Sequence, residues 1–193
     1  MKNRWKVALA GLLVIVAALG FQGDLRAAAT GLTANINIAV GGSYTSTVDL
    51  MTSQATLAFG SHPVAFSFGT GLNQANMLFT DTRSVAAAED QDLAAGGLLD
   101  AFGNTFTIVK MKTLIVCAPT ANTGNIVLGG DAASVLFLSV ATTTTTIKPG
   151  GCFVLTDPSA AGITVTAGTG DIIQAAPSAG TQAYDILIIG ASS

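Results

Sequence analysis

Short runs of apolar residues, separated by glycine, proline and small polar residues, recur along the chain after residue 30. In Val64-x-Phe66-x-Phe68 the two-residue period places all three apolar side chains on one face of an extended strand. The runs are enriched in β-branched and aromatic residues, which is typical of strands. We therefore expect strands at residues 35–40, 45–50, 56–59, 64–68, 105–118, 126–128, 135–140, 142–147, 152–155, 163–167, 171–174 and 184–189.

Glycine, proline, asparagine and aspartate cluster between these runs and predict turns, because they favour the backbone angles that turns require. The segments with this composition are 41–43, 60–63, 100–104, 148–151 and 156–158. Each of them is expected to reverse the chain between two short strands.

The middle of the chain is less regular. Residues 75–80 fit either one helical turn or a strand, and residues 85–89 contain helix formers but are too short for a stable isolated helix. Residues 105–118 are the longest strand candidate, and the five threonines from Thr142 to Thr146 favour a strand over a linker. About ten strands without a domain-scale linker predict an all-β fold, a single jelly-roll-like β-sandwich spanning residues 30–193.

The first 29 residues have the three-part pattern of a secretory signal peptide. Residues 1–6 carry three positive charges, Val7 to Leu19 is continuously apolar, and residues 27–29 are alanines that offer a cleavage site after Ala29. An uncleaved membrane anchor is a second interpretation, and a mis-set start codon or a buried arm is a third. We expect residues 1–29 to direct the protein to a membrane or to hold it there.

Charge is scarce throughout. Charged residues make up 10% of the chain and hydrophobic residues 50%, whereas typical globular domains contain roughly 25% charged residues. Soluble proteins usually keep lysine and glutamate on their surface to stay dispersed. A chain with so few charges is expected to cover part of its surface with copies of itself or with partners, so we expect a homo-oligomer. The alternative is a small monomer with a neutral surface.

The charge balance also disfavours nucleic acid as a partner. Residues 30–193 contain four basic and ten acidic residues, a formal net charge of −6. Phosphate recognition depends on clustered lysine and arginine. Lys110 and Lys112 are two positions apart on an expected strand and so point the same way, but two lysines do not make a nucleic-acid-binding surface.

Two cysteines, Cys117 and Cys152, fall on separate expected strands 35 positions apart. If the strands are neighbours, an exported protein would form a disulfide between them. The alternative is two buried free thiols that pack like small apolar residues.

No residue pattern predicts a catalytic, cofactor or metal site. His62 is the single histidine and is expected in an exposed turn, while Glu89, Asp90 and Asp92 form an acidic cluster without the spacing of a calcium loop. Gly129-Gly130 and the segment 168–170 lack a following helix, so they are predicted to be turns rather than phosphate loops. Core packing is the preferred interpretation of the aromatic residues, and a sugar-stacking face the alternative, for Tyr44, Phe59, Phe66, Phe68 and Phe79.

One succession of turn and strand motifs goes beyond general β patterning. It comprises Gly69–Asn76, Phe79–Arg83, Asp90–Ala94, Leu98–Asn104, Asn122–Asn125 with Gly129-Gly130, Lys148–Gly151, Thr166–Asp171 and Tyr184–Gly190. The succession, roughly from Thr45 to the end, resembles a family of small proteins encoded among the structural genes of tailed bacteriophages and related prophages. The family is usually regarded as virion components, so the resemblance implies a β-sandwich that multimerises on a particle. It carries no catalytic signature, and residues 1–29 depart from its pattern.

These observations favour a non-enzymatic structural subunit of a phage-like virion: a capsid, decoration or spike protein that acts by self-assembly, with Arg83 paired to a carboxylate at a contact. An exported bacterial surface or filament subunit is the alternative, and a secreted carbohydrate-binding β-sandwich is a third interpretation. The expected partners are further copies and other virion or surface proteins, and the expected location is the virion or the cell surface.

Overall fold

The computed structural model describes residues 30–48 and 51–193. These residues form strands and contain no helix, so the all-β prediction is confirmed. The segment 1–29, predicted to be a signal or anchor, lies outside the described residues. The strands are β1 (Ala34–Val48), β2 (Met51–Phe68), β3 (Gln74–Ala75), β4 (Met77–Val85), β5 (Glu89–Asp92), β6 (Leu98–Leu99), β7 (Thr105–Phe106), β8 (Lys110–Cys117), β9 (Ile126–Gly129), β10 (Thr144–Ile147), β11 (Cys152–Thr156), β12 (Ile163–Thr164), β13 (Ile172–Pro177) and β14 (Gln182–Ala191).

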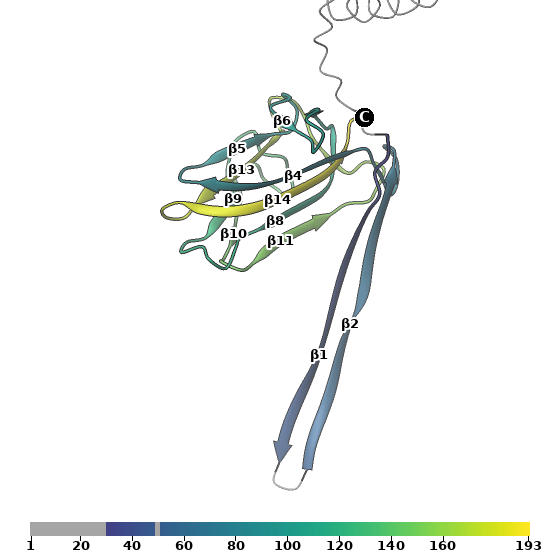
Figure 1. Cartoon of the computed structure of the whole chain (residues 1–193), viewed down its shortest axis with the longest axis vertical. Coiled ribbons are helices and arrows are strands. Elements are labelled where there is room, and N and C mark those ends of the chain that lie inside the picture. Colours follow the sequence, from purple (N-terminus) through teal and green to yellow (C-terminus); the bar gives the residue numbers. More distant parts are fainter. Residues whose placement is uncertain (1–29, 49–50) are drawn as a thin grey trace, which may run out of the picture.

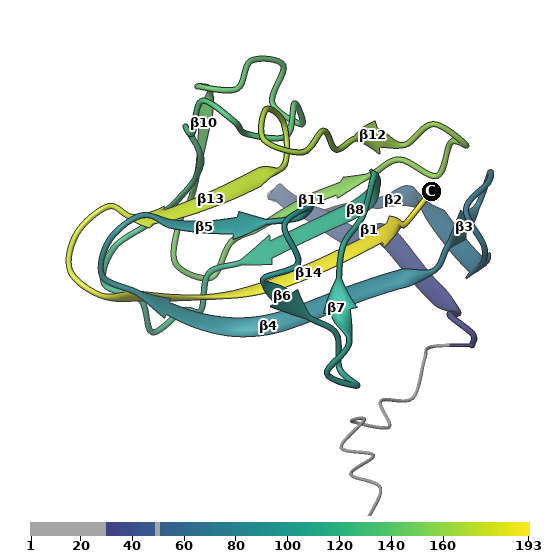
Figure 2. The same ribbon diagram turned by 90° about the horizontal axis from the view of Figure 1, so that it is seen from above.

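Two sheets build the body of the molecule. One is five-stranded, with β11, β8, β14 and β4 in that order and β12 paired to β8, and the other has the order β10-β9-β13-β5. Seen from above, β13 and β5 lie in a layer beside the one that holds β8, β14 and β4 (Figure 2). The short strands β6 and β7 pair with each other.

A continuous apolar core lies between these two sheets. Leu114 of β8 and Ile186 of β14 contact it from the five-stranded sheet, while Leu128 of β9 and Ile173 of β13 contact it from the other. All four side chains are buried. Burial of a side chain of this size stabilises the fold by roughly 1.5–3 kcal/mol, so the apolar alternation of these strands accounts for the packing of the sheets.

Strands β1 and β2 form a long hairpin that extends from the body (Figure 1). The antiparallel pairing runs from Ala34 opposite Phe66 to Val48 opposite Met51. We call the hairpin of β1 and β2 the arm. At about 3.3 Å per residue, the 15 residues of β1 span roughly 50 Å.

The prediction of several short strands in this region is wrong, because the expected turns lie inside the arm. Gly41 and Ser43 stay extended opposite Ala58 and Thr56. The register shifts between Ile38 and Val40, where Gly60 and Ser61 oppose a single residue. A continuous partner strand therefore holds the residues of both predicted turns in the ladder, and the break expected at 60–63 is realised as a bulge.

The root of the arm packs against the five-stranded sheet through a second apolar cluster. Phe66 of β2, Ala75 of β3 and Ile189 of β14 are its buried members. Ile36, Val64, Leu78 and Leu187 are partly buried against them, together with Leu32 and Ala34. The alternation of Val64 and Phe66 thus supplies the contact that fixes the arm to the body.

In the body, two predicted strands differ from the structure, and two segments that the sequence left open are now assigned. Residues 105–118 are divided into β7 and β8, because Ile108 N donates to Leu93 O and Val109 N to Ala191 O. Residues 135–140 are not a strand, since Phe137 N and Val140 N donate to carbonyl groups two residues earlier. Residues 75–80 lie in β3 and β4 rather than a helical turn, and 85–89 link the end of β4 to the start of β5.

The threonine run and the C-terminal strand follow the prediction. Thr144 to Ile147 pair with β9, and β14 lies between β8 and β4 as the central strand of its sheet. No helix long and apolar enough to cross a bilayer occurs among residues 30–48 and 51–193.

Candidate functional site

The histidine is not in a turn, as the sequence predicted, but within β2. His62 is exposed and lies opposite Ile38 of β1. The hydroxyl of its neighbour Ser61 donates to the amide oxygen of Asn37 over 2.6 Å. That serine hydroxyl therefore forms a hydrogen bond within the arm, from β2 to β1.

The acidic cluster of the sequence is divided among separate structural partners. Glu89 accepts from Arg83, Asp90 accepts from the Gln174 amide at 2.8 Å, and Asp92 accepts from the backbone amide of Ala94 at 2.9 Å. Within the described part of the chain, no group of three histidine, cysteine, aspartate or glutamate residues is arranged to hold a metal ion.

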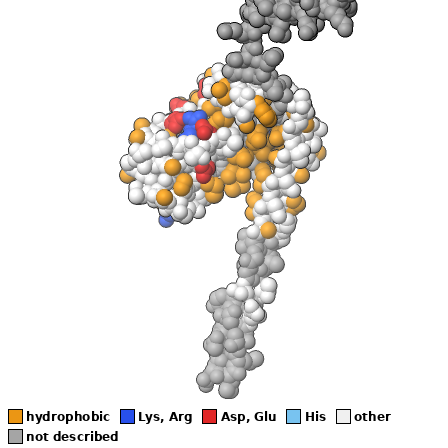
Figure 3. Space-filling view, in the orientation of Figure 1, with side chains coloured by type: hydrophobic (Ala, Val, Ile, Leu, Met, Phe, Trp, Pro, Cys, Tyr) orange, Lys and Arg blue, Asp and Glu red, His pale blue; other side chains and the backbone are white. Residues whose placement is uncertain are grey.

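Arg83 joins the two sheets where their edge strands meet. Its guanidinium lies 3.1 Å from Asp81, also on β4, and pairs with Glu89 on β5. It also lies over the ring of Phe79, 5.9 Å from the centroid. In Figure 3, Lys or Arg atoms (blue) lie next to Asp or Glu atoms (red) on the surface of the body. The carboxylates that pair with Arg83 thus belong to the same chain, whereas the sequence suggested a partner at a contact.

Tyr184 and Gln91 form a buried polar pair that is close enough to Arg83 and Glu89 to feel their charges. The Gln91 amide donates to the Tyr184 hydroxyl over 3.3 Å. Burial, reinforced by the charge of Glu89, raises the pKa of Tyr184 to about 12. The phenol therefore stays neutral at ordinary pH, and the pair is a packing element of the core.

The two lysines of β8 do not share a basic surface. Lys112 is buried, while Lys110 is only half-buried. The Lys112 ammonium donates to the carbonyl of Ser159. Burial lowers the pKa of Lys112, and the charge of Asp157 opposes that shift. Lys112 thus anchors the loop after β11 rather than facing a ligand.

The segment 168–170 is a turn, as predicted, but the turn predicted at Gly129-Gly130 is wrong, because Gly129 is the last residue of β9 and pairs with Thr144. Thr166 accepts from the Gly170 amide at 2.8 Å, and the carboxylate of Asp171 accepts from the Gly168 amide at 2.6 Å. The Gly168 amide thus donates to a buried carboxylate of the chain itself.

The aromatic residues divide between core and surface. Phe66 and Phe79 are buried, which confirms core packing for both, and Phe68 is exposed. The side chains of Tyr44 and Phe59 lie outside the described part of the chain.

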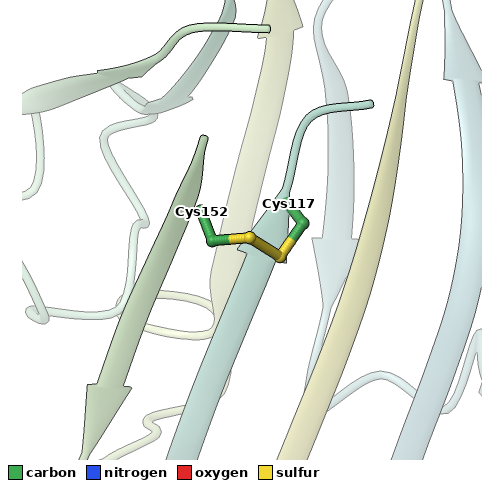
Figure 4. The surroundings of a disulfide bond; sticks show 2 residues. All are labelled: Cys117 and Cys152. Atoms are coloured by element: carbon green, nitrogen blue, oxygen red, sulfur yellow. A yellow bond between two sulfur atoms is a disulfide. The ribbon is translucent and has the colours of Figure 1, made fainter. Parts of the chain in front are cut away.

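Cys117 and Cys152 form a disulfide, which decides between the two alternatives that the sequence left open. The residues face each other across β8 and β11, with Cα atoms 4.1 Å apart (Figure 4). The bond fastens the edge strand β11 to its neighbour, and Cys152 is exposed.

Among the described strands, the two of the arm leave long backbone edges without a partner strand. Among the described residues, β1 pairs only with β2, and β2 pairs with a third strand only at Ser67 and Phe68. From Thr30 to Thr80 the sequence has one aspartate, Asp49, and no glutamate, lysine or arginine. Natural proteins usually protect exposed strand edges with charged residues, above all lysine. The arm lacks that protection.

An apolar surface lies on the side of the five-stranded sheet that faces away from the core. We define the outer face by the side chains that alternate with core residues and point to this side: Leu78, Ile115, Val154, Leu187 and Ile189. Hydrophobic side chains gather between the body and the arm in Figure 3. The candidate functional surface therefore consists of the arm and this outer face.

Sequence reasoning did not identify either part of this surface. The stretch from Thr30 to Thr80, in which Asp49 is the one charged residue, was a visible signal for the arm, but its glycine and proline residues predicted turns. The outer face required the pairing of β11, β8, β14 and β4, which only the tertiary structure gives.

No family model, curated protein or solved structure matches the chain in the three comparisons. The functional argument therefore depends on the chain's own geometry and chemistry.

Proposed function

We propose that the chain is a non-enzymatic structural subunit of a phage-like virion, a capsid, decoration or spike protein, that acts by self-assembly. The observation that carries this proposal is the arm, a long two-stranded hairpin with open backbone edges and almost no charge. The resemblance of the turn and strand motifs to virion proteins supports the same assignment.

The physical argument concerns the stability of the arm. An isolated two-stranded hairpin is at best marginally stable in water, because it has no third strand or packed layer to bury its apolar side chains. Each open edge also presents a row of unpaired amides and carbonyls that template pairing with another chain. An arm of this length is therefore best explained as an element that is completed by neighbouring subunits.

The body supplies a platform for such an arm. In the proposal its two sheets form a jelly-roll-like β-sandwich, and residues 1–29 are a signal or anchor that brings the assembly to a membrane. The low charge of the whole chain fits a surface that is covered by copies and by other virion or surface proteins, without nucleic acid.

The proposal is tested by measuring the mass of the full-length protein by size-exclusion chromatography with light scattering, and by imaging it by negative-stain microscopy. We expect closed rings, shells or filaments. A matched variant lacking residues 43–56, which removes paired positions from both strands, is expected to be monomeric. Its body should keep the thermal midpoint of the wild-type monomer. A full-length chain that stays monomeric at high concentration contradicts the proposal.

A second candidate, an exported bacterial surface or filament subunit, is favoured by the disulfide. Disulfides persist in oxidising compartments and are rare in the cytosol, and Cys117–Cys152 accompanies an N-terminal pattern typical of export. The two candidates differ in where the protein is recovered from the producing cell. Co-sedimentation with nuclease-resistant particles supports the virion subunit, whereas recovery from the washed cell surface without particles supports the exported one.

A further inference from the structure

The outer face continues beyond the part that the arm root covers. Val154 lies opposite Ile115, and Ile115 lies opposite Leu187, so the three residues form one row across β11, β8 and β14. Leu187 is partly buried against the arm root. At the other end of the row, Val154 is 41% exposed. The row therefore runs from a covered region into an uncovered one.

The arm root shows what kind of structure this face accepts. Ile36 of β1 and Val64 of β2 are paired across the arm, and both are partly buried against the same cluster as Leu78 and Leu187 of the outer face. The contact is thus between one face of a two-stranded hairpin and the outside of the sheet. Two residues farther along β1, Ile38 points to the same side as Ile36 but is 43% exposed.

The arm and the face complement each other in composition. Along the row of Val154, Ile115 and Leu187, the position on β4 is Thr80, and the next row has one charged residue, Asp185, which accepts from the Thr82 hydroxyl at 2.6 Å. The arm contributes open backbone edges and no lysine, arginine or glutamate. An uncharged hairpin and an almost uncharged apolar face can associate without desolvating ions, which is the costly part of burying a polar surface.

We propose that the arm of a second copy of this chain lies on the outer face, over Ile115 and Val154, beside the arm root of the first copy. This inference rests on the proposed assembly function and names the surface through which assembly occurs. The second arm repeats the contact that the chain's own root already makes and continues the same apolar packing. Among the described residues β1 pairs with β2 alone, so its other edge can offer backbone amides and carbonyls to a second arm that lies beside it.

The test places a photo-cross-linking amino acid, p-benzoylphenylalanine, at position 154 of the full-length chain. Isotopically light and heavy copies are mixed, assembled, irradiated and digested with chymotrypsin for mass spectrometry. We expect cross-links from position 154 to residues 38–60 of a copy with the other isotopic label. Cross-links to the body of another copy, to residues 1–29, or only within one copy overturn the inference.

A pair of substitutions gives an independent readout. Val154→Asp places a charge on the outer face, and is expected to raise the concentration for half-assembly by roughly tenfold or more. Leu136→Asp is the matched control, because Leu136 is 61% exposed on the loop between β9 and β10, and it should leave assembly unchanged. Circular dichroism spectra and thermal midpoints of both variants show whether the monomer is intact.

The outcomes separate the inference from the function on which it rests. A protein that assembles normally with Val154→Asp, and gives no cross-link to the arm of another copy, retains the assembly function and overturns this docking surface. A protein that never assembles overturns both.

Discussion

Tyr184 is the largest of the fully buried side chains, and it illustrates how single residues fix the interior. Its ring fills the core and its hydroxyl accepts a hydrogen bond from Gln91. The side-chain oxygen of Gln91, Oε1, has no hydrogen-bond partner among the residues that the structure describes. The polar groups at this position thus depend on each other, and removal of one leaves the other unsatisfied in a low-dielectric environment.

We expect the phenol of Tyr184 to make the protein less stable in alkali. Its pKa is raised from 10.0 to about 12 in the folded chain. Between these values the unfolded chain releases the phenolic proton while the folded chain retains it, so the free energy of unfolding falls as pH rises. The free energy of unfolding is unaffected by this group below pH 10, and it falls by up to about 3 kcal/mol between pH 10 and pH 12.

The measurement is urea unfolding of the wild type and of Tyr184→Phe at a series of pH values. The variant is expected to lose about 1 kcal/mol at neutral pH, because Gln91 loses its partner. It should also show a smaller loss of stability above pH 10 than the wild type. Parallel alkaline curves for the two proteins would contradict the assigned role of Tyr184.

Gly190 is required by a close approach of chain segments rather than by its backbone angles. An added Cβ atom would lie 2.8 Å from the Lys110 carbonyl oxygen and 2.7 Å from the Ile108 Cδ1 atom. We expect Gly190→Ala to lower the free energy of unfolding by about 1–3 kcal/mol through overpacking.

Chemical denaturation of Gly190→Ala beside Gly97→Ala checks this prediction. A Cβ atom at Gly97 meets nothing within 4 Å, so the control should change stability by less than about 0.5 kcal/mol. Equal stabilities of the two variants would show that β14 can shift to accept the methyl group.

At the scale of elements, the edges of the sheets are held by different chemistry. The disulfide between Cys117 and Cys152 fastens β11 to β8. Arg83 and Glu89 connect β4 to β5, the edge strands of the two sheets. The central strands β8 and β14 have a partner strand on both sides, and their apolar side chains also form part of the core.

Removing the disulfide is expected to destabilise the body by about 4 kcal/mol, because the bond closes a loop of 35 residues and restricts the unfolded chain. The double variant Cys117→Ser/Cys152→Ser should show a correspondingly lower urea midpoint. A reductant should lower the midpoint of the wild type toward that of the variant, and should leave the variant itself unaffected. A wild type insensitive to full reduction would show that β11 is held by its apolar contacts alone.

At the scale of the whole molecule, the body and the arm differ in how they are stabilised. Apolar residues from two sheets meet in the body's core. Among the side chains that the structure describes, those of the arm that pack on the body lie near its root, at residues such as Ile36, Val64 and Phe66. This difference is the reason why the proposed self-assembly is argued from the arm rather than from a chemical group of the body.

The sequence by itself determined the β character of the chain and the alternation of its strands. Residues 126–128, 152–155 and 184–189 were predicted as strands and lie in β9, β11 and β14. The two-residue period of apolar side chains is a local property of each strand, so it can be recognised without knowledge of the partner strand. The scarcity of charge follows directly from the composition, and the spacing of acidic residues, histidine and cysteines follows from their order in the sequence.

Only the tertiary structure decided which strands meet and where the chain reverses. Gly41 and His62 lie in predicted turns, yet a long partner strand keeps both extended, because each backbone position is held by its ladder. The choice between a disulfide and free thiols needed the register that places Cys152 opposite Cys117. The outer face, with Val154 beside Ile115, arises from strands far apart in sequence, and such long-range pairing leaves no local pattern that a single sequence can reveal.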